Sequence, residues 1–114
     1  LGGPGLRAGA LLVGRGASRV VLASRGGAAS LDGRTLQGPV SATAVAVVAC
    51  DGAEVGNVGA LVQRGALVGV LHTAGVGDKG LLQQLAAVRL AWVHAPKVAA
   101  AWRMHGAAVA AALE

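Results

Sequence analysis

The chain is poor in aromatic residues and in cysteine. Its 114 residues include no Phe, no Tyr, two Trp and one Cys. The single Cys50 excludes a disulfide within the chain and fits a reducing compartment such as the cytoplasm. Ala, Val, Leu and Gly provide nearly all of the bulk, although 54% of residues are hydrophobic. We therefore expect one domain or less, with a thin hydrophobic core.

The sequence also lacks the features expected of proteins that bind nucleic acid, span a membrane, carry a signal peptide or hold a metal ion. The formal charge is +5, but the basic residues are scattered singly and no aromatic residues interleave with them, which argues against nucleic-acid binding. No apolar run approaches the roughly 18 residues of a membrane span, and no signal peptide is visible. His72, His94 and His105 lack acidic or cysteine neighbours at metal-ligand spacing, so we expect no metal site. A cytoplasmic location is predicted.

Glycine, in contrast, is abundant, and a glycine cluster opens the chain. The loop from Leu1 to Leu6 holds three glycines, and a helical pattern follows over residues 7–13 until Gly14 and Gly16 end it. Glycines let the backbone approach a diphosphate, which the amino end of the following helix attracts. Pro4 suits the first turn of that helix. With 19 glycines in the chain, however, the cluster alone is weak evidence for phosphate binding.

An apolar segment over residues 19–23 strengthens this interpretation. After its first residue it is continuously apolar, as in a strand buried on both faces of a parallel sheet. It ends at Ser24 and Arg25, roughly 20 residues after the glycine loop, where a Rossmann unit places its ribose-reading group. A hydroxyl and a planar cation suit a 2′-phosphate, which favours NADP over NAD. The alternative is an ordinary solvated strand end.

The rest of the sequence alternates strand and helix patterns. Strands are predicted at residues 45–49 and 67–72, and a short helix at 54–63, while residues 26–41 form a loop. Residues 81–92 and 97–112 are helical in pattern, with a break before Pro96. Trp92 and Trp102 are expected in the core. This alternation predicts an α/β fold, a Rossmann-like doubly wound parallel sheet.

Five short motifs follow one another at compatible spacing. They are Leu1 to Leu6, Val20 to Gly27, the pair Cys50 and Asp51, Val70 to Val76, and the helical set Pro96, Lys97, Ala101, Trp102 and His105. Together they resemble the ketoreductase domain of modular polyketide synthases and animal-type fatty acid synthases, within the short-chain dehydrogenase/reductase superfamily. The resemblance covers nearly the whole chain.

The resemblance implies a set of residues that bind NADPH. Ser24 and Arg25 would hold the 2′-phosphate, Asp51 would meet the adenine edge, and the turn that contains His72 would pass along the ribose. Gly3 and Gly5 look like the second and third glycines of the family's T-G-x-x-x-G-x-G loop. The complete implied cofactor set is Gly3, Gly5, Leu6, Ser24, Arg25, Cys50, Asp51, His72, Ala74 and Gly75.

The resemblance also implies a catalytic role for Lys97. In this family the matching lysine acts with a Ser and a Tyr from later segments, and hydride passes from NADPH to the β-ketone of a thioester on an acyl carrier protein. Lys97 would lower the pKa of the Tyr that protonates the alkoxide. The plainer alternative is a solvated lysine at a helix start, an awkward place for a cation. A thiol nucleophile built from Cys50 and His72 is disfavoured, because a buried Cys usually acts as a small hydrophobe.

Three features of the sequence depart from the pattern of the ketoreductase family. The chain has no Tyr and no Ser after Ser41, so it should not catalyse alone. The strand that leads into the glycine loop is missing, so we expect residues 1–114 to be a truncated NADP-binding ketoreductase domain of a longer polypeptide, beside other synthase domains. Gly77, Asp78 and Lys79 stand where members of one stereochemical class often have L-D-D.

Two alternatives stay open. The first is a non-catalytic structural subdomain of a polyketide synthase, against which Arg25, Asp51 and Lys97 argue. The second is another NADP-dependent short-chain reductase, against which the position of Lys97 after Pro96 argues, since most relatives carry this lysine on the helix that holds the Tyr.

Overall fold

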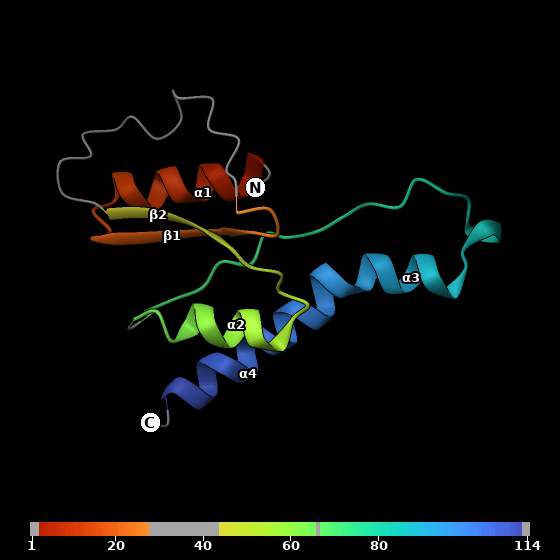
Figure 1. The fold of residues 1–114 in the computed structure, drawn as a ribbon. Coiled ribbons are helices and arrows are strands. Elements are labelled where there is room, and N and C mark those ends of the chain that lie inside the picture. The colour runs from red at the N-terminus through yellow and green to blue at the C-terminus, as the bar shows by residue number, and fades with distance from the viewer. Residues whose placement is uncertain (1–2, 28–43, 66, 113–114) are drawn as a thin grey trace. The chain divides into compact units, whose positions relative to one another are not determined.

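The computed structural model describes residues 3–27, 44–65 and 67–112 (Figure 1). The chain divides into two compact units. The first unit contains residues up to Cys50 together with Leu71–Thr73, and the second contains Asp51–Val70 and the residues from Ala74 onward. Each unit is described separately below.

The first unit is a helix against a pair of parallel strands. Helix α1 (Gly3–Gly14) is followed by β1 (Arg19–Ser24) and β2 (Ala44–Ala49), and the strands pair so that Ser24 lies opposite Ala49. The first two of the three predicted strands are therefore confirmed. Leu22 of β1 is buried, and its Cδ2 atom lies 3.0 Å from the position that a Cβ atom on Gly9 would take. The missing side chain at Gly9 lets α1 lie close to the sheet.

Helix α1 begins earlier than the sequence predicts. Residues 3–6, which we expected in the glycine loop, form its first turn. Pro4 explains this, because its fixed φ matches the helix and its missing N–H has no partner in a first turn. At the other end the helix stops at Gly14 as predicted, and Gly16 adopts a positive φ of 87°.

The second unit is helical. It contains α2 (Val55–Val62), a 3₁₀ turn (Leu82–Gln84), α3 (Ala87–His94), a π-helical turn (Ala95–Ala99) and α4 (Ala100–Ala112). Its core lies where α2 meets α4: Val58 and Ala100 are each only 1% exposed. The core of the described chain is thin, as expected, with Val20, Leu22, Val48 and Cys50 as its other buried hydrophobic residues.

A close contact at Gly52 joins the start of α2 to α4. A Cβ atom on Gly52 would lie 2.7 Å from Ala100 Cβ and 3.3 Å from Met104 Cε. We expect Gly52→Ala to destabilise the protein by about 1–3 kcal/mol, because a methyl group must displace α4. Chemical denaturation measures this. Gly56→Ala is the control: Gly56 has open space around it in α2, so the change should be neutral or stabilising. Equal losses in both variants would contradict the contact.

The predicted third strand does not form. Residues 67–73 are assigned to no strand, and Val68 and Leu71 are exposed. A strand requires a hydrogen-bonded neighbour, and among the described residues the only strand pairing is that of β1 with β2. The described sheet has two strands, and the doubly wound arrangement is seen only in part.

The predicted break before Pro96 is also wrong. The helix continues through a π-helical turn, in which the Ala100 N–H donates to the Ala95 carbonyl five residues earlier. In an α-helix the ring of Pro96 would clash with the carbonyl four residues before it, and the wider turn avoids this. No described helix is both long and apolar enough to cross a membrane.

Two further predictions are wrong, and a third concerns residues that mostly lie outside the described part of the chain. Helix α3 starts at Ala87 rather than near residue 81, because the backbone is extended at Leu85 and Ala86 after the 3₁₀ turn. The two tryptophans are not in the core: Trp92 is 53% and Trp102 76% exposed. Trp102 is two residues from Ala100 and so lies on the opposite side of α4. Of the predicted loop at 26–41, only Gly26 and Gly27 belong to the described residues.

Candidate functional site

One edge of the first unit collects the glycine-rich turn and the end of β1. Helix α1 runs antiparallel to β1, so the amino end of the helix and the carboxyl end of the strand lie at the same edge (Figure 1). Gly5 is buried there, Leu6 is half-buried and Gly3 is exposed. The amino end of a helix carries unpaired N–H groups and a partial positive charge, so this edge can attract an anion.

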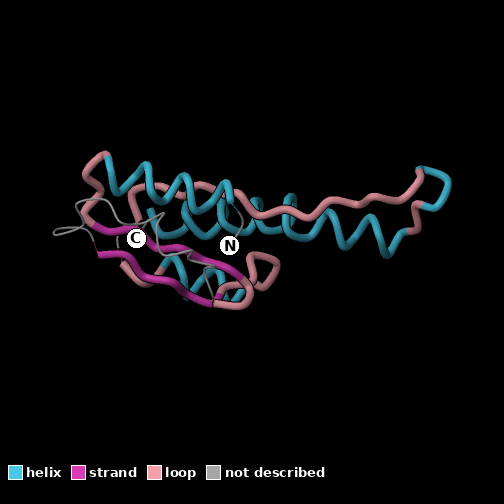
Figure 2. The backbone as a smooth tube through the Cα atoms, turned by 90° about the horizontal axis from the view of Figure 1, so that it is seen from above, coloured by secondary structure: helices cyan, strands magenta, loops and turns pink. Residues whose placement is uncertain are grey.

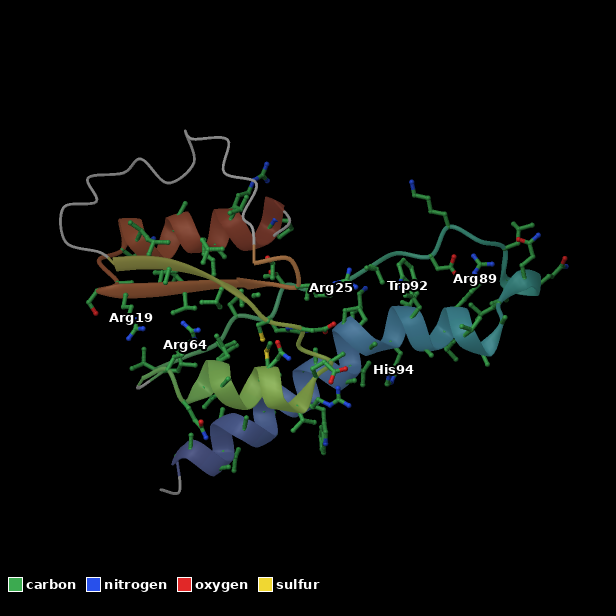
Figure 3. The ribbon with its side chains drawn as sticks, viewed as in Figure 1. Arg19, Arg25, Arg64, Arg89, Trp92 and His94 are labelled. Atoms are coloured by element: carbon green, nitrogen blue, oxygen red, sulfur yellow. The ribbon has the colours of Figure 1, made fainter. Side chains whose placement is uncertain are left out.

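A tight turn places Arg25 at this edge. The Ser24 carbonyl accepts from the Gly27 N–H at 3.1 Å and from the Cys50 N–H at 2.9 Å, which closes the turn and ties it to the end of β2. Arg25 is exposed at the second position of the turn (Figure 3). Its guanidinium is therefore carried by a rigid support at the end of β1.

Gly27 is a residue whose importance the sequence alone did not reveal. Its φ is 62°, and a Cβ atom there would lie 3.1 Å from Ala49 Cβ. Both the left-handed backbone and the close approach favour glycine. The signal in the sequence was the glycine that closes the stretch Val20 to Gly27, but its conformation could not be read from that.

Cys50 and His72 belong to the first unit as well. Cys50 forms no disulfide and is buried, in keeping with the expected small hydrophobe, and His72 is half-buried. The segment Leu71–Thr73, which contains His72, belongs to the first unit, whereas the residues on either side of this segment belong to the second. Among the residues that the structure describes, no three His, Cys, Asp or Glu side chains come together in a way that could hold a metal ion.

In the second unit, Asp51 organises the turn that enters α2. Its carboxylate Oδ1 accepts from the Ala53 N–H at 2.9 Å, and its carbonyl accepts from the Glu54 N–H at 3.0 Å. Asp51 is half-buried. These bonds fix the carboxylate just after the end of β2, and the lone pairs not used by the turn can accept from a ligand.

The second unit also brings Lys97 to Gly75, a residue 22 positions earlier in the chain. A Cβ atom on Gly75 would lie 2.8 Å from Lys97 Cε and 3.6 Å from Lys97 Cγ, so the lysine stem crosses the bare backbone of Gly75. Ala74, Gly75 and Lys97 are all exposed. Two of the predicted motifs, at Val70 to Val76 and at Pro96 to His105, therefore meet through these residues.

An ion pair that sequence reasoning missed joins the loop after Gly75 to α3. Asp78 pairs with the Arg89 guanidinium and accepts from the Gly80 N–H at 2.9 Å, and Figure 3 labels Arg89 on α3. In both Figure 1 and Figure 2, the loop before the 3₁₀ turn runs alongside α3. The two residues are 11 positions apart and carry opposite charges, which by itself does not predict a pair.

This pair makes the stability of the loop at 78–80 depend on pH. The hydrogen bond from Gly80, and then Arg89, lowers the pKa of Asp78 below its ordinary 3.8. A depressed pKa in the folded state contributes stability above about pH 3.8, and this contribution disappears as the pH falls through the lower value. We expect amide hydrogen exchange in the loop at 78–80, corrected for its intrinsic pH dependence, to accelerate in that acidic range. Asp78→Asn should show the faster exchange already at neutral pH; unchanged exchange in this variant would contradict the role of the pair.

The predicted site residues thus divide between the two units. The first unit carries Gly3, Gly5, Leu6, Ser24, Arg25, Cys50 and His72, and the second carries Asp51, Ala74, Gly75 and Lys97. In the first unit the amino end of α1 shares an edge with the carboxyl end of β1 (Figure 1), and in the second Gly75 meets Lys97.

The comparison with protein families decides the identity of the chain. The family model of the KR domain matches residues 1–114. The chain belongs to the KR domain family. The resemblance stated from the five motifs is thereby confirmed. The KR family implies a Rossmann-like fold, and α1 with the parallel pair β1 and β2 is consistent with part of one.

Curated relatives of this KR domain are polyketide synthase proteins. It is 41% identical over 90 residues to polyketide synthase GfsB and 42% identical over 96 residues to polyketide synthase GfsA, both from Streptomyces halstedii, which covers 75% and 79% of this chain. It is also 41% identical over 70 residues, 58% of the chain, to the spectinabilin polyketide synthase system protein NorB from Streptomyces orinoci. The matched chain spans only 1–3% of the length of these relatives. No solved structure matches it. Membership in the family supports a ketoreductase-type role for the KR domain.

Proposed function

We propose that this KR domain binds NADPH and takes part in reducing the β-keto group of a thioester on an acyl carrier protein to a β-hydroxy group. The observation that carries the proposal is the Lys97 stem lying across Gly75, because it joins the predicted catalytic residue to the predicted ribose turn. The match to the KR family over residues 1–114 supports the same reaction type. In this reaction NADPH supplies the hydride.

The first unit would hold the phosphates of the cofactor. Gly3, Gly5 and Leu6 form the amino end of α1, where backbone N–H groups and the helix dipole favour a diphosphate. Ser24 and Arg25 provide a hydroxyl and a planar cation suited to a 2′-phosphate. The exposure of Arg25 on a hydrogen-bonded turn supports this role, since the side chain is accessible to an anion.

The remaining residues would hold the nucleoside and assist proton transfer. Asp51, after Cys50, would accept from the adenine edge, and His72, Ala74 and Gly75 would line the ribose. Lys97 would orient the ribose and hold a positive charge beside a Tyr supplied by another segment, which lowers the pKa of that Tyr. The contact with Gly75 is made by carbon atoms of the Lys97 stem, not by its ammonium.

The partners we propose are the other domains of a polyketide synthase in the same polypeptide, including the carrier protein. The named relatives are synthases of this kind, and this supports the proposal. The test uses the full-length protein that carries these residues, a β-ketoacyl thioester and NADPH, with the decrease in NADPH absorbance as the readout. We expect consumption of NADPH that depends on the thioester. An intact protein that neither binds nor consumes NADPH would instead match the non-catalytic structural subdomain.

A further inference from the structure

The helix that carries Lys97 is held at two points, one on each side of this residue. Before it, Arg89 on α3 pairs with Asp78, and its guanidinium also lies against Gly80. After it, Ala100 on α4 lies against Gly52 and is buried. All of these residues belong to the second unit.

In a continuous α-helix these two anchors would face the same direction. Arg89 and Ala100 are 11 residues apart, and at about 100° per residue this separation leaves them only about 20° apart around the axis. Their partners, however, are different segments: the loop at 78–80 for Arg89, and the turn before α2 for Ala100. Both contacts are made by the observed helix, which contains a π-helical turn between these residues, so a straight α-helix would turn one of the two side chains by about 100° from its observed direction.

The π-helical turn accounts for this difference in direction. A turn closed by a hydrogen bond to the fifth residue back contains one residue more than an α-helical turn. One extra residue changes the direction of α4 relative to α3 by about 100°. The turn covers Ala95–Ala99, so it lies between the two anchors, and Lys97 is its middle residue.

We propose that Pro96 is a positioning residue for Lys97. Proline has no amide N–H to donate and would clash within an α-helical turn, so Pro96 favours the wider π-helical turn. With this turn both anchors are made, and the Lys97 stem is held on Gly75 between them. The role rests on the proposed function of Lys97, because it acts on the reaction only through that side chain.

Pro96→Ala in the full-length protein tests the role. Alanine favours the α-helix, so we expect the π-helical turn to be lost and Lys97 to be displaced. The kcat for β-ketoacyl reduction should fall about tenfold or more, since small misplacements at a reacting centre have effects of this size. The alkaline limb of the pH profile should move to higher pH, as in Lys97→Ala, because the charge near the Tyr is displaced. A purely structural role would not move that limb.

Restoring the register provides the sharper test. Deleting Ala95 in the Pro96→Ala background leaves an α-helix with one residue fewer, which brings both anchors back to their observed directions. We expect this double variant to recover most of the kcat and the original pH limb. Val98→Ala is the control within the same turn: Val98 is 53% exposed, and the change should leave kcat unaltered.

The outcomes separate this inference from the proposed function. If Lys97→Ala impairs reduction but Pro96→Ala keeps the original kcat and pH limb, or if the deletion of Ala95 restores nothing, the positioning role of Pro96 is wrong and the role of Lys97 stands. If Lys97→Ala reduces the thioester as well as the original protein does, the proposed function itself is wrong.

Discussion

Lys97→Ala should lower the kcat of β-ketoacyl reduction by about 10²–10⁴-fold in the full-length protein, the range typical of groups that assist proton transfer. The side chain crosses Gly75, and its ammonium is the charge that we assign to the ribose and to the Tyr of a later segment. Removing this charge raises the pKa of the Tyr, so the alkaline limb of the rate profile should move to higher pH. Steady-state kinetics over a pH series measures both effects.

Lys79 provides a matched control for this variant. It is the other lysine in the chain, is exposed, and belongs to the same unit. Lys79→Ala should leave kcat and the pH profile unchanged. Because Lys97 is itself exposed, neither variant should change the thermal unfolding midpoint appreciably. Equal losses of activity in the two variants would show a general effect of charge and contradict the specific role of Lys97.

Arg25→Ala should raise the Michaelis constant for NADPH by about tenfold to a hundredfold, with a much smaller change for NADH. A hydrogen bond to a charged group contributes about 1.5–3 kcal/mol, which corresponds to this range. Only NADPH carries the 2′-phosphate that we assign to Arg25 and Ser24. Initial rates with each cofactor at saturating thioester provide the measurement.

Arg19 is the control for Arg25 because the two arginines lie at opposite ends of β1, where both are exposed (Figure 3). Arg19→Ala should leave both Michaelis constants unchanged. An equal rise for NADPH and NADH in Arg25→Ala would contradict the assignment to the 2′-phosphate and would favour a general role at the strand end.

The strands and the end of β1 could be predicted because their signals are local. The apolar runs that became β1 and β2 contain β-branched residues and end in polar ones, and Ser24 and Arg25 lie where the pattern placed them. The segment at 67–72 has a similar composition, yet it forms no strand. A strand depends on its neighbour in the sheet, and composition carries no information about whether that neighbour is present.

In the helices, contacts between residues that are separated in sequence outweigh the preferences of single residues. Pro96 predicts a helix end, but a π-helical turn keeps the helix continuous. Trp102 predicts burial, but the small side chain of Ala100 is the one that fits against Gly52. The pair of Asp78 with Arg89, and the contact of Lys97 with Gly75, join residues far apart in sequence, so no periodic pattern could reveal them.

The most direct measurement for the proposed function is the dissociation constant of NADPH, compared with that of NADH, for the full-length protein. Titration followed by the fluorescence of the reduced nicotinamide provides both values. We expect NADPH to bind about tenfold to a hundredfold more tightly, with the difference abolished in Arg25→Ala. Equal binding of the two cofactors, or no binding of either to a folded protein, would contradict an NADPH site at the edge formed by α1 and β1.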